Sequence, residues 1–265
     1  MSKENKEDLM AKGTVGAQLY TVREYTQTLD DLKETLKKVA AAGYTAVQVS
    51  GFGPIDPKDV ASLMQDNNLT VAATHVAWPR FQNDLDAVIE EHKLWGCEHP
   101  AIGGLPKDYY AADGVKRFKD ELTPIAEKLA AEGMDFSYHN HNHELARYGG
   151  KTWLSMLYEE IPGDVLKAEI DTYWIQAGGG DPTLWVAKCG GREPLLHLKD
   201  MMVTPDREQR YAEIGEGNLN WPAIFEAAEA GGVKYYLVEQ DRCYDRDPFE
   251  SLAISYRNLK AMGLR

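Results

Sequence analysis

Three features that would each point to a particular class of protein are scarce or missing in this 265-residue sequence. It has only three cysteines, which lie far apart and form no CxxC pair, so we expect no disulfide framework and a reducing compartment. It has no run of about 18 apolar residues, so no segment is predicted to span a membrane. Basic residues are also few: 29 lysines and arginines stand against 42 acidic residues, a formal net charge of −13.

The acidic balance excludes two kinds of partner. Nucleic acid needs a basic surface to neutralise its phosphates, and anionic lipid attracts the same residues. We therefore expect no nucleic acid and no membrane as partner. The segment 1–13 is polar and lacks the apolar stretch of a signal peptide, so we predict a loosely attached extension of a cytoplasmic protein. The alternative that a signal peptide has already been removed from the sequence stays open.

Short apolar runs alternate with longer amphipathic ones along the rest of the chain, which is typical of βα units. The helical pattern 28–43 places an apolar stripe on one face, with Thr28 as its predicted N-cap. Further helices are predicted at 57–68, 83–96, 116–133 and 247–263. The predicted strands are 14–20, 45–51, 69–76, 99–104, 134–141, 165–171, 194–200 and 234–241.

Eight strands are the number that closes a parallel barrel, so we predict a single (β/α)8 TIM barrel over residues 1–265. The competing architecture is a doubly wound open sheet. The first strand is followed by no GxGxxG pattern, which argues against that alternative.

Buried parallel strands should be almost wholly apolar, yet several predicted strands carry polar residues near their C-terminal ends. In a barrel these ends meet at one mouth, where active sites lie. Unpaired charges there would be unfavourable without a shared partner. A single histidine such as His75 can also be a hydrogen-bonded core residue. The polar set is Gln18, Gln48, His75, His139, Asn140, His141, Glu169, Asp171, His197, Lys199, Asp200, Glu239, Gln240 and Asp241.

A divalent metal ion is the natural partner for such a set. Imidazole and carboxylate ligands from separate strands suit Mn, Co or Zn better than Mg. The predicted ligands are Asp171, His197, Glu239 and a histidine of YHNH. Alternation along the strand places His139 and His141 on the same face, and the sequence leaves open which of the two binds the metal.

The motifs "GAQLYTVR", "YHNHNHEL", "EIDTYW", "HLKD", "EIGEGNLNW" and "LVEQD" occur in an order that resembles the sugar phosphate isomerase/epimerase-like family. These are xylose isomerase-like TIM barrels, and the YHNH subgroup is related to inosose dehydratase and ketose 3-epimerases. The resemblance covers residues 14–262. It implies a divalent metal held by Asp171, His197 and Glu239.

The chain departs from the epimerase pattern at two positions. The epimerases have a glutamate on the fifth strand, where this chain offers histidine. Many relatives have a histidine three residues after the aspartate of strand six, where this chain has Trp174. Of the two glutamates that exchange protons across an enediolate in epimerases, only Glu239 remains, so a one-base reaction fits better than a symmetric two-base epimerisation.

These observations predict a metal-dependent sugar isomerase or epimerase that acts on a keto- or hydroxy-sugar, not phosphorylated, through a metal-stabilised enolate. One alternative is a lyase that dehydrates a keto-inositol or eliminates the aglycone of a 3-keto-glycoside. A second is an inactive sugar-binding barrel. The sequence leaves homo-oligomer formation open. Candidates for proton transfer are Glu239, Glu144, His75 and Lys199. Candidates for substrate contact are Gln18, Tyr20, Gln48, Trp78, Asn140, Trp174 and Glu216, with core packing as the alternative for the two tryptophans.

Overall fold

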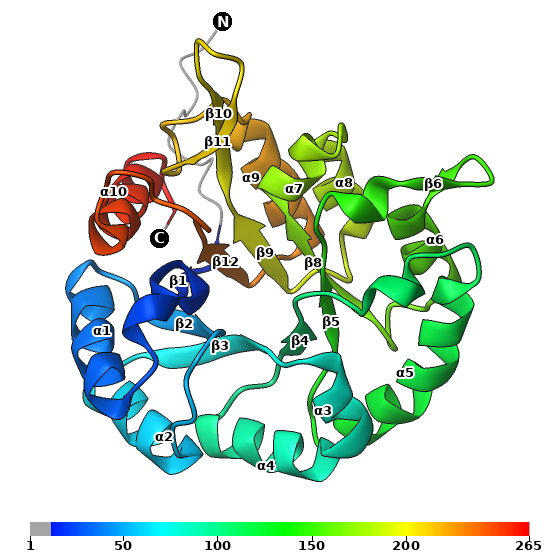
Figure 1. Cartoon of the computed structure of the whole chain (residues 1–265), viewed down its shortest axis with the longest axis horizontal. Coiled ribbons are helices and arrows are strands. Elements are labelled where there is room, and N and C mark those ends of the chain that lie inside the picture. Colours follow the sequence, from blue (N-terminus) through cyan, green and yellow to red (C-terminus); the bar gives the residue numbers. More distant parts are fainter. Residues whose placement is uncertain (1–11, 265) are drawn as a thin grey trace, which may run out of the picture.

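The computed structural model describes residues 12–264 as a closed parallel barrel with helices around it (Figure 1). The strands follow the order β1-β12-β9-β8-β5-β4-β3-β2 around the barrel. The single (β/α)8 TIM barrel is therefore confirmed, and the open sheet is wrong. The part of segment 1–13 that comprises residues 1–11 lies outside the described residues. The barrel strands are β1 (Thr14–Gln18), β2 (Ala46–Val49), β3 (Thr70–His75), β4 (Pro100–Ile102), β5 (Ser137–His139), β8 (Lys167–Asp171), β9 (Leu195–Leu198) and β12 (Tyr235–Val238).

The five predicted helices, which correspond to α1, α2, α4, α5 and α10, begin and end within a few residues of their predicted bounds, whereas α3, α6, α7, α8 and α9 were not predicted. Thr28 caps α1, since its side chain accepts a hydrogen bond from the N–H of Asp31, and Gly96 ends α4 with a left-handed φ of 63°. No helix in residues 12–264 is both long and apolar enough to cross a membrane. The helices are α1 (Leu29–Ala41), α2 (Pro57–Asp66), α3 (Trp78–Asn83), α4 (Leu85–Trp95), α5 (Gly114–Ala131), α6 (Trp153–Glu160), α7 (Thr172–Ala177), α8 (Pro182–Cys189), α9 (Trp221–Gly231) and α10 (Pro248–Ala261).

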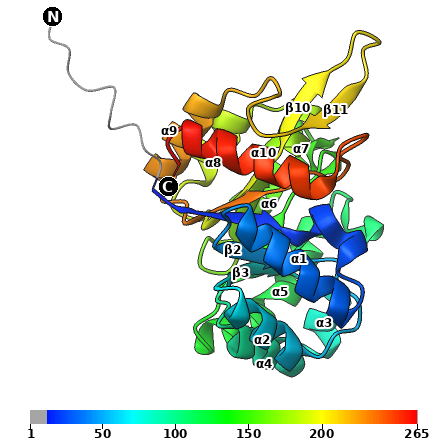
Figure 2. The ribbon, with the colours of Figure 1, turned by 90° about the vertical axis from the view of Figure 1, so that its left-hand side faces the viewer.

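Two hairpins and three short 3-10 helices, which we did not predict, decorate the barrel. The hairpin of β10 (Asp200–Val203) and β11 (Gln209–Ala212) extends away from the barrel (Figure 2). The smaller one pairs β6 (Arg147–Tyr148) with β7 (Lys151–Thr152). The 3-10 helices are Leu19–Tyr25, Lys107–Tyr109 and His143–Leu145. These elements follow strands β1, β4, β5 and β9, and so lie at the end of the barrel where the predicted site residues are.

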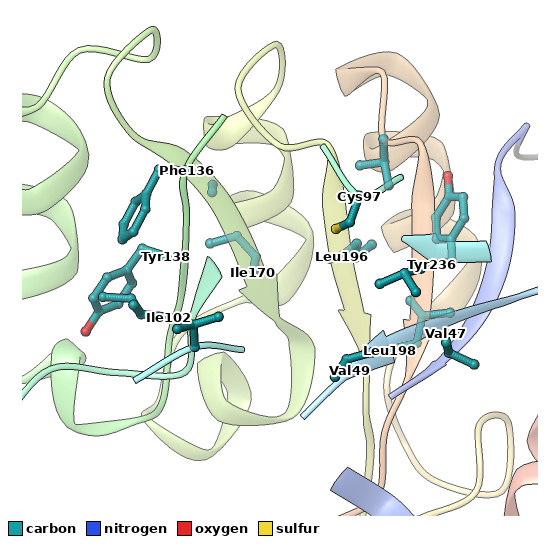
Figure 3. Close-up of a cluster of buried hydrophobic side chains, with 14 of the residues drawn as sticks. Val47, Val49, Cys97, Ile102, Phe136, Tyr138, Ile170, Leu196, Leu198 and Tyr236 are labelled. Atoms are coloured by element: carbon teal, nitrogen blue, oxygen red, sulfur yellow. The ribbon is translucent and has the colours of Figure 1, made fainter. Parts of the chain in front are cut away.

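Alternation along the strands separates two apolar regions. Tyr138, Ile170 and Leu196 belong to the large cluster of buried side chains drawn in Figure 3. Leu195 and Leu237 belong to a separate small cluster with three alanines of β2 and β3. Because residues two apart share a face, the inward residues after Leu195 are His197 and Lys199. The apolar floor of the barrel therefore gives way to polar side chains toward the C-terminal end of the strands.

Candidate active site

Four side chains from four neighbouring strands meet at the C-terminal end of the barrel. Ligand atoms of His139, Asp171, His197 and Glu239 all lie within 4.8 Å of one another. Register explains part of this, because Asp171 on β8 lies directly beside His197 on β9. All four are buried. The predicted strand-by-strand set is therefore brought together, with His139, rather than His141, in the group of four.

The four side chains contact one another directly. His197 Nδ1 lies 2.9 Å from Glu239 Oε2, and His139 Nε2 lies 3.2 Å from Asp171 Oδ2. Burial alone would lower the pKa of His197, but the carboxylates of Glu169 and Glu239 raise it to about 10. Burial and the positive charge of His197 lower the pKa of His139 to about 4. His197 would ligate a cation only after losing its proton, the usual competition between protons and metals.

Lys199 lies beside this group and is almost completely buried. Its Nζ is 3.0 Å from Asp171 Oδ2, 2.8 Å from Glu239 Oε2 and 2.8 Å from Asp241 Oδ2. Burial alone would lower the pKa of Lys199, but the surrounding carboxylates raise it well above its usual value. The hydroxyl of Thr172 accepts a hydrogen bond from the Lys199 N–H at 3.0 Å and so fixes the backbone from which this side chain extends.

A hydrogen-bonded network lies beneath the four residues. His75 Nε2 is 2.8 Å from Glu169 Oε2, and His197 Nε2 is 3.1 Å from Glu169 Oε1. Gln48 donates to Glu169 at 2.6 Å and accepts from Gln18 at 2.7 Å. Burial alone would raise the pKa of Glu169, but the charges of His197 and His75 hold it well below its usual range. Glu169 therefore orients two histidines at once, a role we did not assign to it from the sequence.

A cavity of about 940 Å³ opens above these groups, within the size range of small-molecule sites. Its polar part includes His75, His139, Lys199, Glu239 and Asp241. The remaining wall comes largely from the segments that follow β1, β2, β3, β4 and β5. It is formed by Tyr20, Ser50, Val76, Ala77, Gly103, Gly104, Leu105, Lys107, Tyr110, His141, His143, Ala146 and Tyr148.

Four of the seven predicted substrate residues lie in or near the site. Tyr20 lines the cavity. Gln18 and Gln48 lie below the site, in the Glu169 network. Trp174 lies beside the cavity residue His141, with ring centroids 5.2 Å apart, and its buried indole Nε1 has no partner among the described residues.

Trp78, Asn140 and Glu216 lie elsewhere. Trp78 packs in the core against Phe118, with ring centroids 5.0 Å apart, because α3 turns this residue toward the helices. It is therefore a core residue, which was the alternative to substrate contact. Asn140 Oδ1 accepts from the Asp171 N–H at 3.0 Å and thereby links β5 to β8. Glu216 is exposed and pairs with Arg246 at 3.2 Å.

Glu144, a predicted proton carrier, lies behind the cavity wall. It is fully buried and accepts hydrogen bonds from the hydroxyl of Tyr138 at 2.8 Å and from the N–H of His141 at 2.9 Å. Burial raises the pKa of Glu144 to about 7. These contacts give it a positioning role, since they fix the turn that carries His141.

The donor set fits a divalent cation. Two buried ring nitrogens, Nδ1 of the grouped residue His139 and Nδ1 of the nearby His141, have no partner within residues 12–264, although buried polar atoms are normally paired. Four carboxylates (Glu169, Asp171, Glu239 and Asp241) face the ammonium of Lys199 and the imidazolium of His197, which still leaves an excess of negative charge for a cation to balance.

Asp200 binds the loop that follows β11. It does not pair with the adjacent Lys199, because neighbouring strand residues point to opposite sides. The buried carboxylate accepts five hydrogen bonds instead. The donors are the N–H groups of Met201, Gly215, Gly217 and Leu219 and the Trp221 Nε1–H, at 2.7–3.2 Å.

Asp200→Asn is expected to lower the free energy of unfolding by about 3–5 kcal/mol. Whichever way the amide points, its NH2 group faces at least two buried donors that lose their acceptor. Chemical denaturation measures the loss, with Asp206→Asn on the exposed hairpin as control. A loss below about 1 kcal/mol would show that the loop does not depend on this carboxylate.

Fold and site together define a class: a (β/α)8 barrel with a buried imidazole–carboxylate cluster under a cavity at its C-terminal mouth. The chain belongs to the xylose isomerase-like TIM barrel family, whose model matches residues 36–258. The resemblance drawn from the motifs is thereby confirmed. The comparison with curated proteins gave no match.

Solved structures of sugar isomerases or epimerases and of a dehydratase have the same fold. The chain is similar to a sugar phosphate isomerase/epimerase from Parabacteroides distasonis, at 24% identity and a TM-score of 0.80 over 98% of each chain. It is similar to an L-ribulose 3-epimerase at 19% identity and a TM-score of 0.73, covering 95% of this chain and 94% of that one. It is also similar to a probable 3-DHS dehydratase from Bacillus anthracis, at 12% identity and a TM-score of 0.71, covering 93% of this chain and 98% of that one. At these identities the likeness shows the fold alone.

Proposed function

We propose that the protein is a divalent-metal-dependent sugar isomerase or epimerase that acts on a keto- or hydroxy-sugar. The observation that carries this proposal is the convergence of His139, Asp171, His197 and Glu239 within 4.8 Å beneath a small-molecule cavity. The neighbouring folds of sugar isomerases and epimerases support the substrate class.

His139, Asp171, His197 and Glu239 would hold the cation. Two imidazoles and two carboxylates suit Mn, Co or Zn better than Mg, which prefers oxygen ligands. When bound, the cation polarises a sugar carbonyl and makes the neighbouring C–H acidic. Lys199 supplies a further positive charge at the edge of the cavity, where it can favour a negatively charged sugar oxygen.

Two residues on nearly opposite sides of the barrel are placed to move protons. Glu239 follows β12 and His75 ends β3, and two strands separate β12 from β3 around the barrel. Both line the cavity. Glu169 holds His75 through Nε2, which fixes the orientation of the ring. Nδ1 of His75, with only a long 3.4 Å contact to Gln18, is then the nitrogen that exchanges a proton.

This arrangement supplies the second proton carrier that the fifth strand lacks. A base on one side removes the proton from the sugar carbon, and an acid on the other returns a proton to the same or the adjacent carbon. A pair of this kind supports isomerisation or epimerisation. The sequence favoured a one-base reaction. We propose instead that His75, already a candidate for proton transfer, acts together with Glu239.

Elimination is the second candidate because of the size of the cavity. Its volume of about 940 Å³ lies at the upper end of the ~300–1,000 Å³ typical of ligand pockets, and its outer wall includes Leu105, Tyr110 and Tyr148. This wall leaves room for an aglycone beyond a single sugar ring. A 3-keto-glycoside could therefore occupy the site and lose its aglycone from an enolate.

Turnover in deuterated water tests both functions. Metal-reconstituted protein is incubated with ketohexoses, inososes and 3-keto-glucosides, and the products are resolved by NMR, with metal-stripped protein as control. We expect deuterium next to the carbonyl without loss of a substituent. Release of water or aglycone would support the lyase instead. A protein that binds metal but leaves every compound unchanged would contradict both.

A further inference from the structure

The ammonium group of Lys199 contacts the same oxygen atoms that a bound cation would need. It lies 3.0 Å from Asp171 Oδ2 and 2.8 Å from Glu239 Oε2, and both residues belong to the group of four. Metal–oxygen bonds of about 2.0–2.2 Å would bring a divalent cation within a few ångströms of this ammonium. Two positive charges at that separation repel each other strongly in a buried site.

We propose that Lys199 is a built-in counter-cation of the metal site: it neutralises the ligand carboxylates in the metal-free protein and is displaced when a divalent cation binds. This inference rests on the proposed metal-dependent function. It assigns Lys199 a positioning role toward the metal site, in addition to any contact with substrate.

A place for the displaced ammonium already exists. Asp241 Oδ2 lies 2.8 Å from Lys199 Nζ but is outside the group of four ligands. The ring centroids of Trp174 and Tyr211 lie 5.5 and 5.9 Å from Nζ, and aromatic faces attract an ammonium ion. Thr172 fixes the backbone, so a rotation of the side chain alone moves the charge from the ligands to Asp241 and the rings.

The displacement has a consequence for metal affinity. Buried carboxylates without a cation repel one another and lose hydration, which is unfavourable. In the metal-free protein the ammonium of Lys199 offsets this energy through its ion pairs with Asp171 and Glu239. A divalent cation must then break two of the three ion pairs of Lys199 before it binds. The wild-type protein therefore binds metal more weakly than its four ligands alone would allow.

Lys199→Met is the direct test, because methionine is an unbranched side chain only one atom shorter than lysine and carries no charge. The dissociation constant for Mn²⁺ is measured by competition with a metal-sensitive dye at one fixed pH. We expect it to fall about tenfold or more. Lys107→Met is the matched control: Lys107 lines the same cavity but forms no ion pair among the described residues, so a change below about threefold is expected.

A second measurement, of melting temperature, keeps the inference testable if the variant is less stable than wild type. Metal-free Lys199→Met should melt at a lower temperature than wild type, and Mn²⁺ should raise its melting temperature by more than it raises that of wild type. Lys199→Gln, which keeps a polar end, should bind Mn²⁺ more tightly in the same way.

The outcomes separate this inference from the proposed function. Wild-type protein that binds no divalent cation would overturn both. Wild-type binding that Asp171→Asn abolishes, together with unchanged or weaker binding by Lys199→Met and Lys199→Gln, would overturn the inference alone and leave the metal site in place.

Discussion

Asp171→Asn is expected to lower the affinity for divalent cations by about 100-fold or more and to reduce turnover by a larger factor. The amide has nearly the same shape as the carboxylate, and its oxygen can still accept the N–H of Trp174 that caps α7. What is lost is the negative charge shared by the cation site and by Lys199. Metal content after dialysis and the rate of the NMR assay measure the two effects.

Asp181→Asn is the matched control for this substitution. Asp181 also caps a helix, because it accepts the N–H groups of Thr183 and Leu184 at the start of α8. Asparagine is as good an N-cap as aspartate, so metal content and turnover should stay at wild-type values. If Asp171→Asn kept its metal, the cation would have to be held by other residues, and the four-residue site would be wrong.

The fold could be predicted because its signal is repeated eight times. Eight short apolar runs recur along the chain, and five of them are followed by a predicted amphipathic helix. A missed helix therefore leaves the number of strands intact. The ends of the strands were less certain. The segment 134–141 reads as one strand, but β5 covers only Ser137–His139, and Asn140 after it binds β8 through its side chain instead of its backbone.

The group of four could be predicted for a similar reason. Parallel strands deliver their C-terminal ends to one mouth, so Asp171, His197 and Glu239 are brought together by topology without knowledge of side-chain packing. Alternation placed both His139 and His141 on the same inner face, and only the structure shows that His139 joins the group. These inferences need only two facts about each residue: which face of its strand it lies on, and how far along the strand it lies.

The remaining residues depend on contacts that alternation does not determine. Trp78 lies just after a strand, where its side chain can point into either the cavity or the core. The direction of α3 determines which of the two it enters. Glu144 is three residues beyond His141, and its carboxylate turns back to bind the His141 N–H. Glu169 was visible as a buried charge, but its partner His75 comes from a strand on the far side of the barrel.

The charges at the mouth illustrate the same limit. From the sequence, buried carboxylates on separate strands indicated a cation, and a metal was the cation that we expected. The structure adds that Lys199 already neutralises two of the ligands. Whether a lysine reaches the carboxylates of neighbouring strands depends on its rotamer and on the backbone turn at Thr172, which only the folded structure supplies.

His75→Gln is expected to lower turnover by about 100-fold or more and to leave the metal content unchanged. Glutamine can still donate a hydrogen bond to Glu169, so the network beneath the site keeps its main contact, but an amide cannot carry the proton that we assign to Nδ1. The loss should appear as slower deuterium exchange at the sugar carbon. Because removal and return of the proton are assigned to opposite sides, one of the two steps should slow more than the other.

His99→Gln is the matched control at the other end of the barrel. His99 is likewise buried and paired with a carboxylate, with Nδ1 2.9 Å from Asp135 Oδ2, so the substitution removes the same type of pair far from the cavity. Turnover should then stay within about threefold of wild type, since the variant changes stability and not proton transfer. Equal losses in His75→Gln and His99→Gln would mean that both act through stability. In that case the second proton carrier must be sought elsewhere, and Lys199 is the next group on the cavity wall to examine.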